Sequence, residues 1–131
     1  MKLPLITFLL LFVGAEFNSA GAEPSEVAGY NVERLATAIY HAEGGAKTRH
    51  PYGILAKYKT TTPRQACINT IRSKYRMWST DSCHNYGECV GFLEFLASKY
   101  APTIGNSLTN DERRLNIHWL KNVRYFYNRS Q

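Results

Sequence analysis

The chain has 131 residues, of which 44% are hydrophobic and 20% charged, with nine Gly and five Pro. This composition excludes a low-complexity, disordered or collagen-like chain and predicts one small globular domain. Sixteen Lys and Arg against ten Asp and Glu give a net charge of +6. Such a charge attracts polyanions, namely nucleic acid, anionic lipid or acidic cell-wall polymer, without choosing among them.

The first residues are typical of an export signal. Lys2 supplies a positive charge, and residues 3–13 are almost entirely apolar. That run is too short to cross a bilayer, which needs about 20 residues. The small residues Ala20-Gly21-Ala22 suit a signal peptidase, which is expected to cleave after Ala22, so that the mature chain starts near Glu23. Cleavage after Ala20 is the alternative. We therefore expect a signal peptide over residues 1–22, a domain over residues 23–131, a periplasmic or secreted protein, and no stable membrane insertion after cleavage.

All three cysteines follow this leader, and an exported chain meets a compartment where disulfides form. Cys83 and Cys89 enclose a short turn-like stretch, which predicts a disulfide between them. Cys67 follows a helical apolar pattern and is predicted to be buried and reduced. Zinc binding by Cys83, His84 and Cys89 is a weak alternative, because zinc sites normally show four ligands in paired short spacings. We expect neither a metal nor another cofactor.

Apolar residues recur every three or four positions in four segments, which predicts a mainly α fold with four helices around one core. The helices are expected over residues 32–43, 62–78, 88–100 and 109–126. The residues expected to face the core are Val32, Leu35, Ala36, Ile39, Tyr40, Cys67, Ile68, Ile71, Tyr75, Trp78, Cys89, Phe92, Leu93, Leu96, Leu115, Trp119, Val123 and Phe126.

Two of the helices begin with the spacing of a capping box. Thr62 is followed by Pro63 at the first helical position and by Gln65, and Thr109 is followed by Glu112. Residues 44–61 show no helical period and predict a loop or a small hairpin. So long a connection in so small a domain is more often functional than idle.

Glu43 is the acidic residue whose position is unusual for a solvated surface. Leu35, Ile39 and Glu43 are spaced by four, so the carboxylate shares the apolar face of its helix. It also lies in the last turn, where the helix dipole disfavours a negative charge. Both effects raise the pKa, which suits a general acid near neutral pH. The alternative is a glutamate at a frayed helix end, turned into water.

The residues after Glu43 favour a binding cleft. Gly44-Gly45 leaves room for a bulky substrate, and Pro51-Tyr52-Gly53-Ile54 supplies a rigid turn, an aromatic ring and a glycine. Ala42-Glu43-Gly44-Gly45 and Tyr52-Gly53-Ile54-Leu55 resemble motifs of the lysozyme-like superfamily, especially the small soluble lytic transglycosylases that cut bacterial peptidoglycan. The resemblance spans about residues 31–124. Gly44 replaces a frequent serine and Leu55 the usual glutamine.

The resemblance implies a single lysozyme-like helical domain with the loop of residues 44–61 at the cleft. It implies that Glu43 is catalytic, protonating the leaving oxygen and then helping the muramyl 6-hydroxyl to attack C1, which gives a 1,6-anhydro sugar. The residues it implies for substrate binding are Gly45, Tyr52, Gly53, Ile54 and Tyr100.

The count of carboxylates agrees with that route. Hydrolysis of a glycosidic bond normally needs two carboxylates about 5–9 Å apart. No acidic residue lies between Glu43 and Asp81, although Asp81, Glu88 or Asp111 remain candidates for a second one. A lysozyme-type hydrolase is therefore one alternative. A non-catalytic exported wall-binding module, favoured by the missing serine and glutamine, is the other.

The expected partner is the glycan strand of peptidoglycan, bound by a monomer. A wall-spanning machine is a further candidate partner, because a local opening in the wall would serve it. No nucleic-acid binding is expected, because the chain lacks a stripe of Lys and Arg interleaved with aromatic residues.

Overall fold

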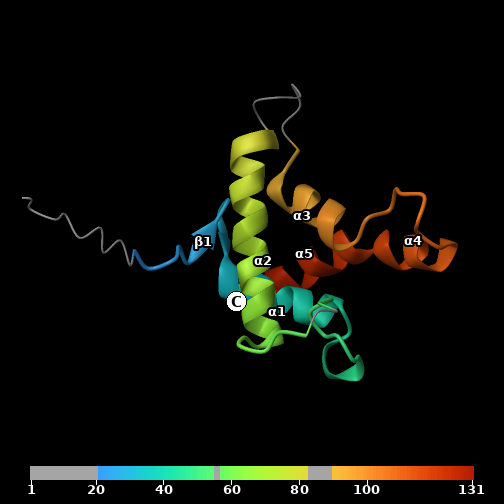
Figure 1. Ribbon diagram of the computed structural model, residues 1–131, viewed down its shortest axis with the longest axis horizontal. Helices are drawn as coiled ribbons and strands as arrows, with labels where there is room; N and C mark the ends of the chain where they lie inside the picture. The colour runs from blue at the N-terminus through green and yellow to red at the C-terminus, as the bar shows by residue number, and fades with distance from the viewer. Residues whose placement is uncertain (1–20, 55–56, 83–89) are drawn as a thin grey trace, which may run out of the picture.

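The computed structural model describes residues 21–54, 57–82 and 90–131, and it confirms the mainly helical class (Figure 1). Residues 1–20 of the expected signal peptide, Leu55, Glu88 and both cysteines of the expected Cys83–Cys89 disulfide lie outside the described residues. Among the described residues, no helix is long and apolar enough to cross a membrane. The elements are β1 (Glu26–Val27), β2 (Tyr30–Asn31), α1 (Val32–Ala42), a 3-10 turn η1 (Gly45–Lys47), α2 (Pro63–Met77), a π-helical turn η2 (Trp78–Ser82), α3 (Phe92–Tyr100), α4 (Asn110–Asn116) and α5 (Trp119–Arg129).

Helix α1 is the centre of the core. It packs against α5 and α2, and α3 packs against α2 and α5. The face of α1 that carries Leu35 and Ile39 is fully buried, as its spacing predicts. Cys67 of α2 is also buried and unbridged, as predicted. The other fully or nearly fully buried apolar residues are Val27, Val32, Ala36, Ala38, Ala66, Ile68, Ile71, Phe92, Leu93, Leu96, Ala101, Trp119 and Val123.

The start of α1 is tied to the end of α5. The Asn31 side chain caps α1 by accepting the backbone N–H of Arg34 at 2.9 Å. The N–H of Asn31 donates to the Tyr127 hydroxyl at 3.0 Å, and Arg34 Nε donates to the Tyr127 carbonyl at 2.8 Å. These contacts fix the register of α1 against α5. The register in turn sets which side chains lie together where α1 ends and α5 begins.

The two expected capping boxes form to different extents. At α4 the box is complete, since Thr109 and Glu112 exchange both hydrogen bonds. At α2 the Thr62 hydroxyl accepts the N–H of Gln65 at 3.1 Å, but the Gln65 amide donates to Asn69 instead of returning to Thr62. The second half of that box was wrongly predicted.

The fourth predicted helix is two helices. The chain turns at Ile117 and His118, where the N–H of His118 bonds to the Leu115 carbonyl three residues back. This turn rotates α5 relative to α4, so Trp119 is buried while Leu115 is 71% exposed. The prediction that Leu115 faces the core is wrong, because the spacing of four between Leu115 and Trp119 acts only within one continuous helix.

The start of the third helix and the structure of the predicted loop also differ from expectation. Helix α3 begins at Phe92, since the described residues Val90 and Gly91 are not helical. Residues 44–54 and 57–61, the described part of the predicted loop, contain turns and η1 but no strand. The loop is confirmed and the hairpin is wrong there. The hairpin of the described chain is β1–β2, whose strands of two residues are too short to show a period.

We expect the buried and exposed leucines to differ strongly in their contribution to stability. Leu35→Ala leaves a cavity under α1 and should lower the free energy of unfolding by about 2–5 kcal/mol. Leu115→Ala, the matched control on a solvated face, should change it by less than about 0.5 kcal/mol. Urea unfolding of both variants measures this, and equal losses would contradict the division of the fourth helix.

Candidate active site

Glu43 is the C-cap of α1, the residue directly after Ala42. Its N–H donates to the Ile39 carbonyl at 2.9 Å, so its backbone is still held by the helix. Gly44 follows with a φ of 96°, the left-handed conformation that commonly ends a helix, and its N–H bonds to the His41 carbonyl at 3.1 Å. The helix therefore ends as predicted and fixes the position of the carboxylate.

The Glu43 side chain faces a cavity of about 400 Å³ between the end of α1 and the start of α5. The cavity brings together three residues singled out from the sequence: Glu43, Gly53 and Tyr100. Among the described residues that line it, Glu43 is the one carboxylic acid. The remaining residues that line the cavity are Ala42, Leu115, Asn116, His118, Trp119 and Asn122.

Trp119 holds the Glu43 carboxylate in place. Its indole Nε1 donates to Glu43 Oε1 at 2.7 Å. The Tyr100 ring stacks on the Trp119 ring, with 5.3 Å between centroids and 21° between planes. The Tyr100 hydroxyl in turn donates to the Cys67 Sγ at 3.3 Å. This chain of contacts runs from α1 through α5 and α3 to α2. All four of these helices therefore contribute to the position of the Glu43 carboxylate.

Burial raises the pKa of Glu43 above its ordinary value of 4.5, and the hydrogen bond from Trp119 opposes that rise to a smaller extent. A half-buried carboxyl keeps its proton at a higher pH than an exposed one, because the charged form loses hydration. A carboxyl in this setting is chemically suited to donate a proton. A glutamate turned into water, the alternative from the sequence, does not match this hydrogen-bonded side chain.

Gly53 lies directly over the carboxylate. Its φ is 66°, and a Cβ at this position would be 2.9 Å from Glu43 Oε1 and 3.2 Å from Tyr100 Cε1. Glycine is required here both for the backbone conformation and for the close approach. Only the bare backbone of this residue leaves the cavity open.

The remaining predicted binding residues lie outside this cavity. Gly45 is buried against the Tyr40 ring, where an added Cβ would be 3.0 Å from Cε1. Tyr52 and Ile54 line a neighbouring hollow formed by the loop. The sequence resemblance placed all of them in the cleft, and the structure brings only Gly53 and Tyr100 to Glu43.

The candidates for a second carboxylate do not join Glu43 in the described chain. Asp111 is exposed at the start of α4, with its Oδ1 3.5 Å from an Arg114 guanidinium nitrogen. Glu88 and the side chain of Asp81 lie outside the description. Among the described residues, no group of three or more His, Cys, Asp or Glu side chains is arranged to hold a metal ion. The zinc alternative at Cys83 falls on residues that are not described.

Trp119 and His118 also line the cavity, although neither was expected there from the sequence. Trp119 was expected only in the core, yet a buried indole N–H needs an acceptor, and that requirement was a usable signal. His118 and Asn122 follow no pattern that distinguishes them from other exposed polar residues. They reach the cavity through the turn between α4 and α5.

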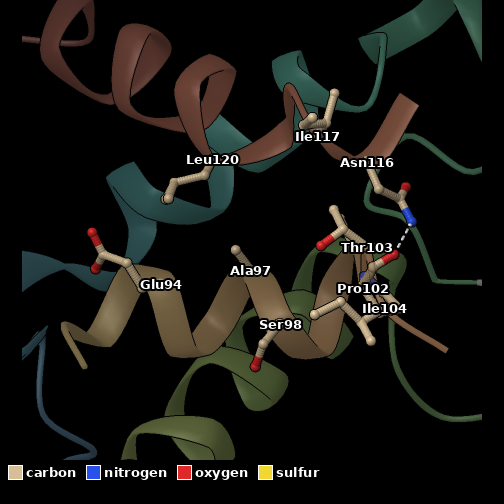
Figure 2. A pocket seen from close by; sticks show the side chains of 10 residues that line it. Glu94, Ala97, Ser98, Pro102, Thr103, Ile104, Asn116, Ile117 and Leu120 are labelled. Carbon is tan, nitrogen blue, oxygen red and sulfur yellow. Dashed lines mark hydrogen bonds between the residues drawn. The ribbon is translucent and has the colours of Figure 1, made fainter. Parts of the chain in front are cut away.

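A second hollow of about 400 Å³ adjoins the first at Asn116, which lines both (Figure 2). The Asn116 amide donates to the Pro102 carbonyl at 2.8 Å, the dashed contact in Figure 2, and is thereby fixed at the boundary. Beyond it the hollow runs between α3, which contributes Ala97 and Ser98, and the start of α5, which contributes Leu120. The two adjoining hollows together can hold an elongated ligand, longer than a single sugar ring.

The fold and site define a mainly helical domain with a half-buried carboxylic acid in an open cavity. No protein-family model, no curated protein and no solved structure matches the chain.

We expect Gly53→Ala to cost more stability than Gly29→Ala. Both glycines have a positive φ, but an added Cβ meets Glu43 and Tyr100 at Gly53 and nothing within 4 Å at Gly29. Backbone strain of about 1–2 kcal/mol is common to both variants. Steric overlap should add at least about 1 kcal/mol at Gly53.

Urea unfolding of the two glycine variants gives the difference. The excess cost of Gly53→Ala should shrink in a Glu43→Ala protein, where the nearest atom is gone. Equal costs for the two glycines would show that Gly53 does not approach the carboxylate.

Proposed function

We propose that the protein is an exported peptidoglycan lytic transglycosylase with a lysozyme-like helical domain, in which Glu43 cleaves the MurNAc–GlcNAc bond. The observation that carries this proposal is the Glu43 carboxyl: half-buried, raised in pKa, hydrogen-bonded to Trp119 and open to a cavity. No other described residue that lines the Glu43 cavity is acidic, and Glu94, which lines the adjoining hollow, is paired with Arg124. A single titrating carboxyl suits a reaction that needs one group to act in turn as acid and base.

The proton balance of the reaction closes on Glu43 alone. Trp119 occupies Oε1, so the proton is carried on Oε2. The carboxyl gives this proton to the glycosidic oxygen as the bond from C1 to that oxygen breaks. The carboxylate then takes the proton of the muramyl 6-hydroxyl as this oxygen bonds to C1. The enzyme ends in the protonated state in which it began, and the product is a 1,6-anhydro sugar.

The nucleophile belongs to the substrate, which gives it a high effective concentration without a second carboxylate. The polar side chains of the cavity, Asn116, His118 and Asn122, provide hydrogen bonds for sugar hydroxyls without adding a negative charge. The hollow beyond Asn116 accommodates further sugar rings. The net charge of +6 favours approach to an anionic wall.

The two alternatives are weaker on these observations. A lysozyme-type hydrolase needs a second carboxylate across the sugar. Asp111 is exposed and paired with Arg114, and Glu94, which lines the adjoining hollow, is paired with Arg124. A wall-binding module without activity has no use for a carboxyl whose charged form is disfavoured by burial. Both remain distinct outcomes of the experiment below.

We expect Glu43→Gln to lower the rate of sacculus lysis by at least about 100-fold, because it removes the transferable proton and keeps the acceptor for Trp119. Asp111→Asn is the matched control and should retain wild-type lysis. The measurement is turbidity clearance of purified sacculi with mass analysis of the released muropeptides.

The products distinguish the classes of enzyme. Wild-type protein should release 1,6-anhydro ends. Reducing ends labelled at C1 by heavy-oxygen water would establish a hydrolase instead. Full lysis by Glu43→Gln would refute the assignment of Glu43, and no lysis by folded wild-type protein would favour the binding module.

A further inference from the structure

The loop after Glu43 forms a hollow of its own, of about 430 Å³, which we call the loop pocket. Its lining combines cationic and aromatic side chains and contains no carboxylate among the described residues. The members that matter for recognition are Arg49, His50, Tyr52, Ile54, Lys57 and Tyr58.

The positive charges of the loop pocket are not neutralised by the chain around them. The sequence has no Asp or Glu between Glu43 and Asp81. Within the described part of the chain, no carboxylate forms an ion pair with Arg49 or Lys57. Glu33, an acidic residue on the neighbouring α1, is paired with Arg64 at 2.9 Å. The pocket therefore favours an anion with an apolar or planar part beside it.

The loop pocket adjoins the Glu43 cavity. Tyr52 and Ile54 line the pocket, while Gly53 between them lines the cavity. One stretch of backbone is thus the wall of both spaces. A branch of a ligand seated against Glu43 would pass Gly53 to reach Arg49 and Lys57.

We propose that the loop pocket binds the carboxylates of the peptide stems carried by the muramyl residues of the substrate. This inference rests on the proposed function. A branch of three or four residues spans up to about 10–14 Å when extended, and the two spaces share the backbone of residues 52–54 as a wall. The pocket would thereby select peptide-bearing strands over bare glycan. The shared wall at Gly53 favours a branch of the substrate over a separate polyanion.

The test uses the full mature chain with Glu43→Gln, so that binding is measured without cleavage. The probes are a muramyl tripeptide with free carboxylates and the same compound with its carboxylates amidated, titrated by calorimetry. The free acid should bind at least about tenfold more tightly, as expected for two charge-assisted contacts at a partly exposed site. Arg49→Gln with Lys57→Gln should remove that advantage.

The matched control is Lys47→Gln with Lys59→Gln, which removes the same charge from two lysines that are exposed, as Arg49 and Lys57 are, but lie outside the pocket lining. It should keep the affinity within about twofold, because separated surface charges are screened. Equal binding of the acid and the amide, or an equal loss in the control, would overturn the inference. Tighter binding of a single-stranded oligonucleotide through Arg49 and Lys57 would also overturn it.

The outcome is separable from that of the proposed function. Wild-type protein that releases anhydro products while the pocket variants bind the probe normally would refute the loop pocket alone. Absence of cleavage, with selective binding of the acid through Arg49 and Lys57, would refute the transglycosylase and keep the pocket as an acidic-peptide site.

Discussion

The hydrogen bond from Trp119 to Glu43 is the contact on which the site depends. It joins residues 76 positions apart and connects the start of α5 to the end of α1. Each partner is unfavourable without the other, because a buried indole N–H and a half-buried carboxylate both lose hydration. The packing of α1 on α5, fixed at the opposite end by Asn31 and Tyr127, brings the two side chains together. The site is therefore formed only when α1 and α5 are packed together.

This arrangement places a cost on stability at neutral pH. Because burial raises the pKa of Glu43, the folded state favours the protonated carboxyl. The resulting stabilisation is present below the ordinary pKa of 4.5 and is lost as the pH rises through the higher folded value. An ionised Glu43 thus opposes folding above that value, and the apolar core of α1 and its neighbours offsets it. A half-buried carboxyl of raised pKa that faces a cavity is a candidate functional group.

Local features of the sequence predict the parts of the structure that are local. The period of Leu35 and Ile39 predicts the buried face of α1, and the pair Thr109 and Glu112 predicts the cap of α4. The turn at Ile117 was missed because Leu115 and Trp119 keep helical spacing across it. Glu43 and Gly53 are near in sequence and were found together, whereas Trp119 reaches the site only through the packing of α5.

The pKa of Glu43 is the most direct test of this account. Titration of its carboxyl carbon by ¹³C NMR should give a pKa above 4.5 in the wild-type protein. Trp119→Phe keeps an aromatic ring in the core but removes the N–H that stabilises the carboxylate, so the pKa should rise further. A wild-type pKa at or below 4.5, or a fall in the Trp119→Phe protein, would contradict the assignment of Glu43 as a half-buried acid held by Trp119.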